Sequence, residues 1–218
     1  PLLAQVRSWA NITLVDLPGC APGLAAGENC DPGDVMDAVL AVAPQRAVYL
    51  GWSLGGQLAL ELAARNPERV AALVTVCSNP HFVADTDWPG MEAEAFARFQ
   101  AAYAADPAAA LRRFGSLQAQ GAKRPRQLLR QLQGQRAAPP GAELLPGLRW
   151  LARLDQRGLL QGLQQPRLHL LAEHDQLVPA DLARQFAKLS SPAAPAQVQL
   201  LRGASHLAPL DSAPLVAA

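Results

Sequence analysis

The sequence predicts an α/β fold with a mostly parallel central sheet, flanking helices and an inserted all-helical cap. Strand-like apolar runs alternate with helical patterns up to residue 80, and the alternation returns after residue 165. Between these parts, from Met91 to about Gln161, the patterns are helical and no convincing strand occurs. We therefore expect residues 1–80 to form the first part of the core, 81–165 the cap and 166–218 the second part of the core.

The core is expected to contain strands joined by amphipathic helices. One helix begins at Pro32 with Asp31 as its N-cap, and the next carries Leu54, Leu58 and Leu62 at helical spacing. We expect the strand before Leu54 to be central in the sheet. The predicted strands are the runs 12–15, 47–50, 70–77, 168–171 and 198–201, and a further helix is expected from Leu182 to Leu189.

Composition excludes several classes of protein. A net charge of +1 predicts no general attraction to nucleic acid. No run approaches the roughly 18 apolar residues of a membrane span, and the first residues lack the pattern of a signal peptide, so we expect a cytoplasmic protein with no membrane contact. The widely spaced Cys20, Cys30 and Cys77 argue against a disulfide scaffold or a zinc site, and Cys77 is expected to be a buried small hydrophobe. We expect no metal and no cofactor.

The run Gly51-Trp52-Ser53-Leu54-Gly55-Gly56 lies between a predicted strand and a predicted helix. A glycine on each side lets the backbone reverse sharply and present the hydroxyl of Ser53, which is typical of the nucleophile elbow of an α/β-hydrolase. The N–H of Leu54, at the positive end of the helix, is then the candidate oxyanion donor. The alternative is a glycine-rich turn with a bystander serine. Trp52 and Leu54 are candidates for an apolar substrate wall, although Trp52 can equally belong to the core.

A serine nucleophile needs a general base, and that base needs an orienting carboxylate. In α/β-hydrolases the three follow in the order serine, acid, histidine, each on a loop after a strand. Ser53, Asp175 and His206 satisfy this order, which predicts the nucleophile, the orienting acceptor and the general base. Glu173 is the main rival of Asp175, and His206 has the alternative of a structural histidine. The remaining histidines, less suited by position, are His81, His169 and His174.

The predicted cap is rich in basic residues with few acids between them: Arg112, Arg113, Lys123, Arg124, Arg126 and Arg130. Arg126 and Arg130 are four residues apart and would share one helix face. Composition alone favours a solvated helical surface. The alternative is a docking patch for a phosphorylated or acidic partner.

Five segments together resemble one family over nearly the whole chain. They are Val15-Asp16-Leu17-Pro18-Gly19, the elbow Gly51–Gly56, the run Pro67–Val76, Trp88-Pro89-Gly90-Met91 and Phe114-Gly115-Ser116-Leu117-Gln118. The chain resembles the BioH family of pimeloyl-[acyl-carrier protein] methyl ester carboxylesterases, members of the α/β-hydrolase superfamily.

The resemblance implies hydrolysis of the methyl ester of a pimeloyl chain on acyl-carrier protein, in biotin biosynthesis, by a monomer without a cofactor. It implies the triad Ser53, Asp175 and His206, and an oxyanion donor at Leu54. Further residues are implied in contact with the substrate or the carrier. Ser53, Leu54, Phe114, Gln118 and His206 would contact the substrate, and Arg113, Arg126 and Arg130 the carrier.

The chain also departs from the family pattern. One family arginine falls near Ala109, so that contact is expected to be lost or taken over by Arg112. Nothing before Trp9 matches the family's further strand and His-Gly-Trp-Gly loop, and the last helix stops early at Ala218, so we expect a chain truncated at both ends. Two alternatives stay open: a general esterase or lactonase for small esters, and a noncatalytic module that binds the carrier or an acyl ligand.

Overall fold

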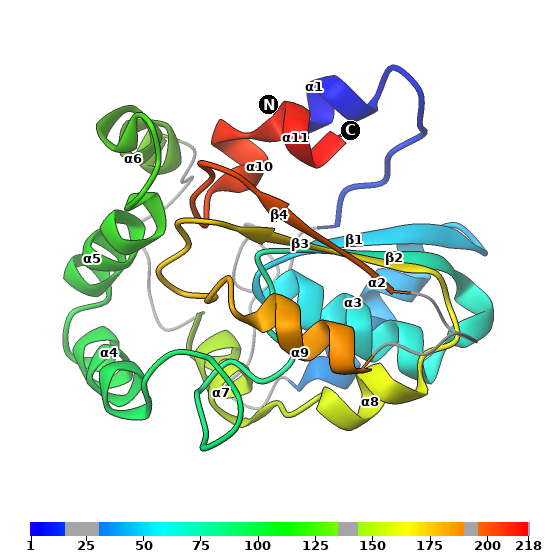
Figure 1. The fold of residues 1–218 in the computed structure, drawn as a ribbon, viewed down its shortest axis with the longest axis horizontal. Helices are drawn as coiled ribbons and strands as arrows, with labels where there is room; N and C mark the ends of the chain where they lie inside the picture. Colours follow the sequence, from blue (N-terminus) through cyan, green and yellow to red (C-terminus); the bar gives the residue numbers. More distant parts are fainter. Residues whose placement is uncertain (16–30, 135–143, 190–195, 218) are drawn as a thin grey trace.

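The computed structural model describes residues 1–15, 31–134, 144–189 and 196–217. Its centre is a four-stranded sheet in the order β1-β2-β3-β4, with every neighbouring pair parallel (Figure 1). The strands are β1 (Ala47–Trp52), β2 (Val70–Val76), β3 (Arg167–Ala172) and β4 (Ala196–Leu201). Because helices pack on both faces of this parallel sheet, the predicted α/β class is confirmed.

The helices, with their bounds, are α1 (Leu2–Val6), α2 (Pro32–Val42), α3 (Leu54–Arg65), the 3-10 turn η1 (Pro67–Arg69), α4 (Ala93–Ala105), α5 (Pro107–Ala119), α6 (Pro125–Gly134), α7 (Leu145–Arg153), α8 (Arg157–Gly162), α9 (Leu182–Leu189), α10 (Ala208–Asp211) and α11 (Ala213–Ala217). No helix among the described residues is both long enough and apolar enough to cross a bilayer.

Two apolar layers hold the sheet between its helices. The larger layer packs α3, α8 and α9 on one face through Leu62, Leu160 and Phe186. The smaller layer covers the other face, where Val76 and Cys77 meet Ala208 and Val216 of the C-terminal helices. In Figure 1 the red C-terminal helices and the blue α1 accordingly lie above the sheet, and α3 and α9 lie below it.

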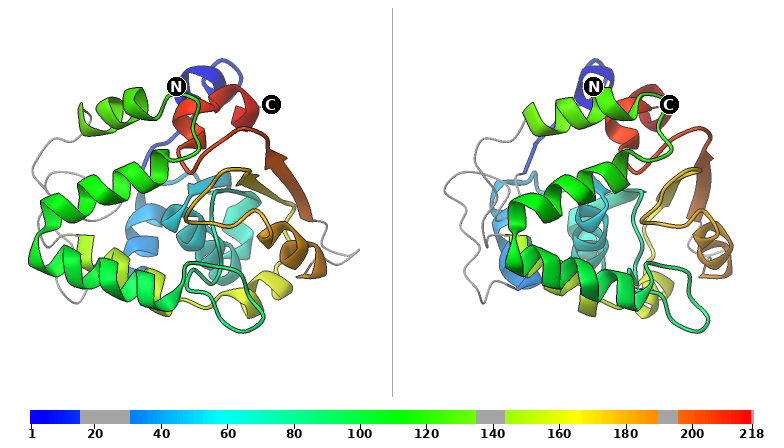
Figure 2. Two further views of the ribbon diagram at one scale, coloured as in Figure 1. Left: turned by 60° about the vertical axis from the view of Figure 1, so that its left-hand side comes forward. Right: turned by 90° about the vertical axis from the view of Figure 1, so that its left-hand side faces the viewer.

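Helix starts follow local capping rules. The carboxylate of Asp31 accepts hydrogen bonds from the N–H groups of Gly33 and Asp34, and the carboxylate of Asp34 accepts one from the N–H of Asp31. The predicted N-cap of α2 is therefore confirmed, as part of a capping box. Asp106 caps α5 in a similar way, accepting from the N–H of Ala109 at 2.9 Å. The helices α4 to α8 come from the chain between β2 and β3, and α4, α5 and α6 project together to one side of the sheet (Figure 2).

Two expectations about the start of the sheet are wrong. Residues 12–15 form no strand, because no strand among the described residues pairs with them, and Leu14 is 68% exposed. Strand β1 is not central: among the described residues it pairs with β2 alone, which leaves its other edge open. The side chains of Val48 and Leu50, two residues apart and so on one face of β1, are exposed. The predicted turn at 16–19 and the loop from Cys20 to Asn29 lie outside the described residues.

Candidate active site

Ser53 lies on a strained turn between β1 and α3. Its φ of 54° falls in the left-handed region, which a residue with a Cβ rarely adopts. Two backbone hydrogen bonds hold it there: the N–H of Ser53 donates to the carbonyl of Val76 at 2.9 Å, and the N–H of Gly56 donates to the carbonyl of Ser53 at 2.9 Å. The sheet and the first turn of α3 thus fix the direction of the hydroxyl.

The glycines of this turn are not equivalent. A Cβ on Gly51 would lie 2.2 Å from the carbonyl oxygen of Gly55, and one on Gly56 would lie 2.5 Å from the Cβ of Ser78. A Cβ on Gly55 would meet nothing within 4 Å. The expectation that a glycine on each side of Ser53 avoids a Cβ clash is therefore correct for Gly51 and wrong for Gly55, where a Cβ has room. The second position closed by its neighbours is Gly56.

Ser53, His206 and Asp175 lie in one hydrogen-bonded row. The Oγ of Ser53 lies 3.0 Å from Nε2 of His206, and Nδ1 of His206 lies 2.8 Å from Oδ2 of Asp175. The side chains of His206 and Asp175 are completely buried. An ionised carboxylate only accepts, so Nδ1 carries the proton and Nε2 is left as an acceptor facing the serine hydroxyl.

The carboxylate of Asp175 is fixed by its own loop. Its Oδ1 accepts from the N–H groups of Leu177 at 2.8 Å and Val178 at 3.0 Å, which leaves Oδ2 for His206. The rival Glu173 accepts from the N–H of Gly203 at 2.8 Å and forms no hydrogen bond with His206. Glu173 therefore ties the acid loop to the loop that carries the histidine.

The three other histidines stand apart from this row. His169 is buried in β3, stacks on Phe186 with ring centroids 4.1 Å apart and pairs with Thr75 at 2.7 Å. Burial lowers the pKa of His169 to about 3, with a smaller contribution from the nearby Arg167 cation, so it is neutral at neutral pH. His174 is half-exposed on the acid loop, and His81 lies beside Asp85.

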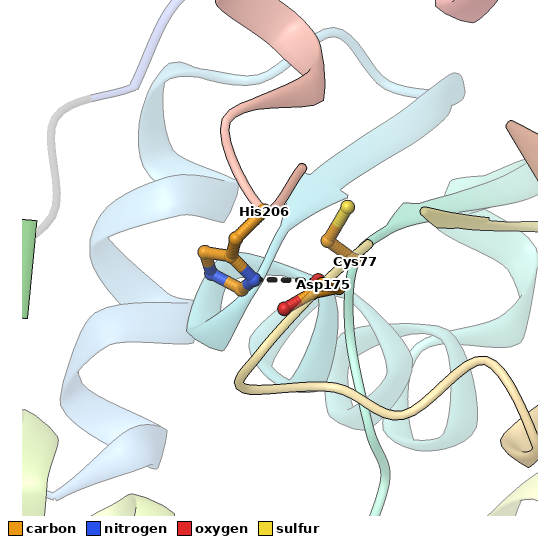
Figure 3. A group of neighbouring side chains, drawn as sticks. All are labelled: Cys77, Asp175 and His206. Carbon is orange, nitrogen blue, oxygen red and sulfur yellow. Dashed lines mark hydrogen bonds and ion pairs between the residues drawn. The ribbon is translucent and has the colours of Figure 1, made fainter. Parts of the chain in front are cut away.

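Cys77 lies next to Asp175, as Figure 3 shows. The ligand atoms of Cys77, Asp175 and His206 lie within 4.8 Å of one another, a spacing that can hold a metal ion. Both oxygens of Asp175 already accept hydrogen bonds, one of them from His206. Burial, and then the charge of Asp175, raise the pKa of the Cys77 thiol well above its usual value, so it is a poor metal ligand. We interpret the cluster as the hydrogen-bonded row and a buried neutral thiol.

Trp52 contacts His206, which sequence reasoning missed. Its indole N–H donates to the backbone carbonyl of His206 at 2.9 Å, and the two rings lie 5.7 Å apart at 43°. The predictions for Trp52 were a substrate wall or the core. The only signal in the sequence was its place next to the candidate nucleophile.

Leu54 is the first residue of α3, with Ser53 as its N-cap. The N–H of a first helical residue has no acceptor within its own helix. It is therefore free to bind an oxygen that develops negative charge beside Ser53. The side chain of Leu54 lies against α7, where a Cβ on Gly147 would come within 3.1 Å of it.

The turn between α5 and α6 touches the acid loop. Gly121 has a φ of +84°, and a Cβ there would lie 2.4 Å from the Cβ of His174. Ala119 and Leu128, on either side of this turn, pack with Leu207, the residue after His206. The turn between α5 and α6 therefore packs against the loop that carries Asp175 and the loop that carries His206.

The residues expected to contact substrate and carrier lie on these helices. Phe114 and Gln118 are half-buried on α5, and Phe114 stacks on Phe99 with centroids 5.0 Å apart. No hydrogen bond or ring contact in the described residues joins Phe114 or Gln118 to Ser53 or His206. The predicted basic side chains are all exposed: Arg112 and Arg113 on α5, Lys123 and Arg124 before α6, and Arg126 and Arg130 on α6.

A cavity of about 530 Å³ lies between α1, α2 and the open edge of β1. Residues lining it include Ile12, Leu14, Val39 and Leu50, and neither Ser53 nor His206 belongs to its lining. The lining also includes Gly51, Trp52 and Gly55, so the cavity reaches the turn that carries Ser53.

Comparison with known proteins gives concordant results. The model of the alpha/beta hydrolase fold family matches residues 10–213. The chain is 39% identical over 207 residues to the biotin biosynthesis bifunctional protein BioHC of Cellvibrio japonicus, covering 94% of this chain and 40% of that protein. It is 42% identical over 185 residues to the pimeloyl-[acyl-carrier protein] methyl ester esterase of Methylococcus capsulatus, covering 83% of this chain and 72% of that one.

A solved structure shares the fold at low sequence identity. The esterase EaEST of Exiguobacterium antarcticum superposes with a TM-score of 0.81 at 17% identity, covering 93% of this chain and 76% of the esterase. The chain thus spans less than half of the bifunctional relative and nearly three quarters of the single-function one. The resemblance stated from the five sequence segments is confirmed: the chain belongs to the alpha/beta hydrolase fold family and, within it, to the BioH family of ester hydrolases.

Proposed function

We propose that this chain is a serine carboxylesterase that hydrolyses the methyl ester of a pimeloyl group on acyl-carrier protein, a reaction of biotin biosynthesis. The relatives named above support the substrate, since their names give biotin biosynthesis and a pimeloyl-[acyl-carrier protein] methyl ester. The observation that carries the proposal is the hydrogen-bonded row of Ser53, His206 and Asp175 at the start of α3.

In the first half of the reaction, the Oγ of Ser53 attacks the ester carbonyl carbon and its proton passes to Nε2 of His206. The carbonyl oxygen becomes an oxyanion, which the N–H of Leu54 stabilises. Asp175 holds Nδ1–H in place and stabilises the imidazolium. When the tetrahedral intermediate collapses, the methoxy group takes the proton from His206 and leaves as methanol, and the acyl group stays on Ser53.

In the second half, water attacks the acyl-enzyme while His206 takes a proton from it. Collapse returns that proton to the Oγ of Ser53 and releases the free carboxylic acid. The sum is one ester and one water giving one acid and one methanol, and the enzyme is restored.

We propose that residues 81–165 act as a cap over this site and that residues 1–80 and 166–218 form the core. Phe114 and Gln118 on α5 would contact the acyl chain. The contacts of Gly121 with His174, and of Leu128 with Leu207, support a cap that is fixed to the catalytic loops.

We propose that Arg113, Arg126 and Arg130 bind the acidic carrier and the phosphate of its prosthetic arm. Residues 107–134 contain six basic residues and no acidic one. Within the described part of the chain these three guanidinium groups form no ion pair with a carboxylate, so their charge is available to a partner. The monomeric state and the cytoplasmic location predicted from the sequence remain parts of this proposal.

Replacement of Ser53 tests the chemistry. We expect Ser53→Ala to abolish hydrolysis of both carrier-bound pimeloyl methyl ester and p-nitrophenyl acetate, with an unchanged circular dichroism spectrum. A fluorophosphonate probe should label the unmodified chain once, on Ser53, as found by peptide mass spectrometry. Turnover by Ser53→Ala, or labelling at another serine, would refute the assignment. Failure of the probe to label Ser53, together with no turnover of either ester, would favour a noncatalytic module that binds the carrier or an acyl ligand.

Charge reversal tests the docking of the carrier. The double variant Arg126→Glu, Arg130→Glu reverses two charges four residues apart on α6, and Arg184→Glu, Lys188→Glu makes the same change on α9. We expect the α6 variant to lose at least about tenfold in kcat/KM for carrier-bound ester, with p-nitrophenyl acetate unaffected. The α9 variant should match the unmodified chain on both substrates. Equal losses on both substrates, or in both variants, would remove the docking role and favour a general small-ester hydrolase.

A further inference from the structure

Trp52 and Ser53 are neighbours in the chain, and both reach the same distant residue. The Oγ of Ser53 meets Nε2 of His206 at 3.0 Å, and the indole N–H of Trp52 meets the backbone carbonyl of His206 at 2.9 Å. The sequence separations are 153 and 154 residues. One end of β1 therefore holds both the imidazole and the backbone that carries it.

The carbonyl of His206 needs this donor because its local donors are missing. The residue three positions on is Pro209, which has no N–H. The next N–H, that of Leu210, donates to the carbonyl of Leu207. Within the described residues no backbone N–H bonds to the carbonyl of His206, and the residue is completely buried. A buried carbonyl without a partner is costly, so the indole N–H stabilises this backbone conformation.

The bond also completes the restraints on the imidazole. Asp175 fixes Nδ1, and the tilted ring of Trp52 packs beside the imidazole with centroids 5.7 Å apart. These contacts orient the ring about its own bonds, but its distance from Ser53 depends on where the backbone of residue 206 lies. Trp52 sets that distance from the same strand end that carries Ser53.

We propose that Trp52 is a positioning residue that keeps the backbone of His206 at a fixed distance from Ser53. The nucleophile and its base then move together when either loop moves. This inference rests on the roles proposed for Ser53 and His206. It separates Trp52 from a substrate wall. A positioning residue changes kcat with KM unchanged, since it acts on proton transfer, whereas a wall residue changes KM by removing substrate contacts.

Trp52→Phe removes the N–H and keeps an aromatic ring. Trp88→Phe is the matched control, because Trp88 is buried and its indole N–H donates to Oδ1 of Asn79 at 2.8 Å, away from the hydrogen-bonded row. With p-nitrophenyl acetate we expect Trp52→Phe to lower kcat about 10- to 100-fold, with KM within about twofold of the unmodified chain. The rate of fluorophosphonate labelling of Ser53 should fall by a similar factor. Trp88→Phe should change neither quantity by more than about twofold.

A second variant distinguishes loss of the N–H from loss of packing, because phenylalanine is also smaller than tryptophan. Incorporation of β-(3-benzothienyl)alanine at position 52 replaces the indole N–H with sulfur and preserves the bicyclic shape. We expect the same fall in kcat from this variant, with an unfolding midpoint close to that of the unmodified chain. An unchanged kcat in this variant, a raised KM with kcat preserved, or an equal fall in Trp88→Phe would each overturn the proposal. If the unmodified chain neither labels nor turns over ester, the proposed function fails first and this inference fails with it.

Discussion

The glycines around Ser53 should respond to substitution in opposite ways. In Gly51→Ala the new Cβ would lie 2.2, 2.4 and 2.5 Å from the Gly55 carbonyl oxygen, the Gly55 carbonyl carbon and the Gly56 nitrogen. All three are backbone atoms of the first turn of α3, so relief requires movement of the turn that carries Ser53. Overpacking against movable side chains costs about 1–3 kcal/mol, and we expect this variant to lose about 3 kcal/mol or more of unfolding free energy.

Gly55→Ala tests the same reasoning at a glycine that has room for a Cβ. Its Cβ would meet nothing within 4 Å, and the residue lies in the first turn of α3. Alanine is a better helix former than glycine by up to about 1 kcal/mol, so we expect stability to be unchanged or raised by up to about that amount. Urea unfolding, followed by tryptophan fluorescence, gives the free energy of unfolding of each variant. The rate of p-nitrophenyl acetate hydrolysis shows whether the turn still holds Ser53 in its active position. A loss of stability in Gly55→Ala as large as in Gly51→Ala would refute the geometric argument.

Three further predictions concern the loops and the buried histidine. Gly121→Ala should lower both esterase activity and stability, because its Cβ would lie 2.4 Å from that of His174 at a φ of +84°. Asp175→Asn should lower kcat about 10³- to 10⁴-fold, since an amide can donate to Nδ1 and favour the wrong tautomer of His206. Burial lowers the pKa of His169 to about 3, so only the unfolded chain binds a proton there between pH 6.5 and 3, and stability should fall with falling pH by about 1.4 kcal/mol per unit.

Each of these has its own check. For Gly121→Ala the comparison is Gly158→Ala on α8, where a Cβ meets nothing within 4 Å, and equal effects of the two would count against the contact. For Asp175→Asn, an unchanged thermal unfolding midpoint would show that the fall in kcat comes from the tautomer of His206. A lowered midpoint would show that the fold itself is lost. For His169 the variant His169→Gln should show a shallower loss of stability below pH 6.5, and identical slopes would reject the buried neutral state.

Local patterns predicted most of the sheet and the elbow. The strands 70–77, 168–171 and 198–201 were found because apolar runs between turns are a local property of the chain. Chain order also predicted that the side chains of Ser53, Asp175 and His206 would meet, and the structure puts them in hydrogen-bonding distance. Their catalytic roles, and the cap boundaries, stay predictions until the experiments above are done.

The errors came from partners that a local pattern cannot identify. Residues 12–15 have strand-forming side chains, but a strand exists only where another strand pairs with it. For the same reason the apolar run of β1 did not show that it lies at an edge. The bond from Trp52 to His206 spans 154 residues, and the difference between Gly55 and Gly56 depends on Ser78, which follows the next strand.

The open side of β1 has a consequence for the behaviour of the protein in concentrated solution. Among the described residues no strand pairs with that side, so its backbone N–H and C=O groups form a template on which another extended chain can add as a strand. Self-association should therefore begin at β1. A strand added there would displace the turn that carries Ser53, because this turn directly follows β1. Loss of esterase activity on standing would then precede any loss of helix, and a lysine in place of Val48 would delay it.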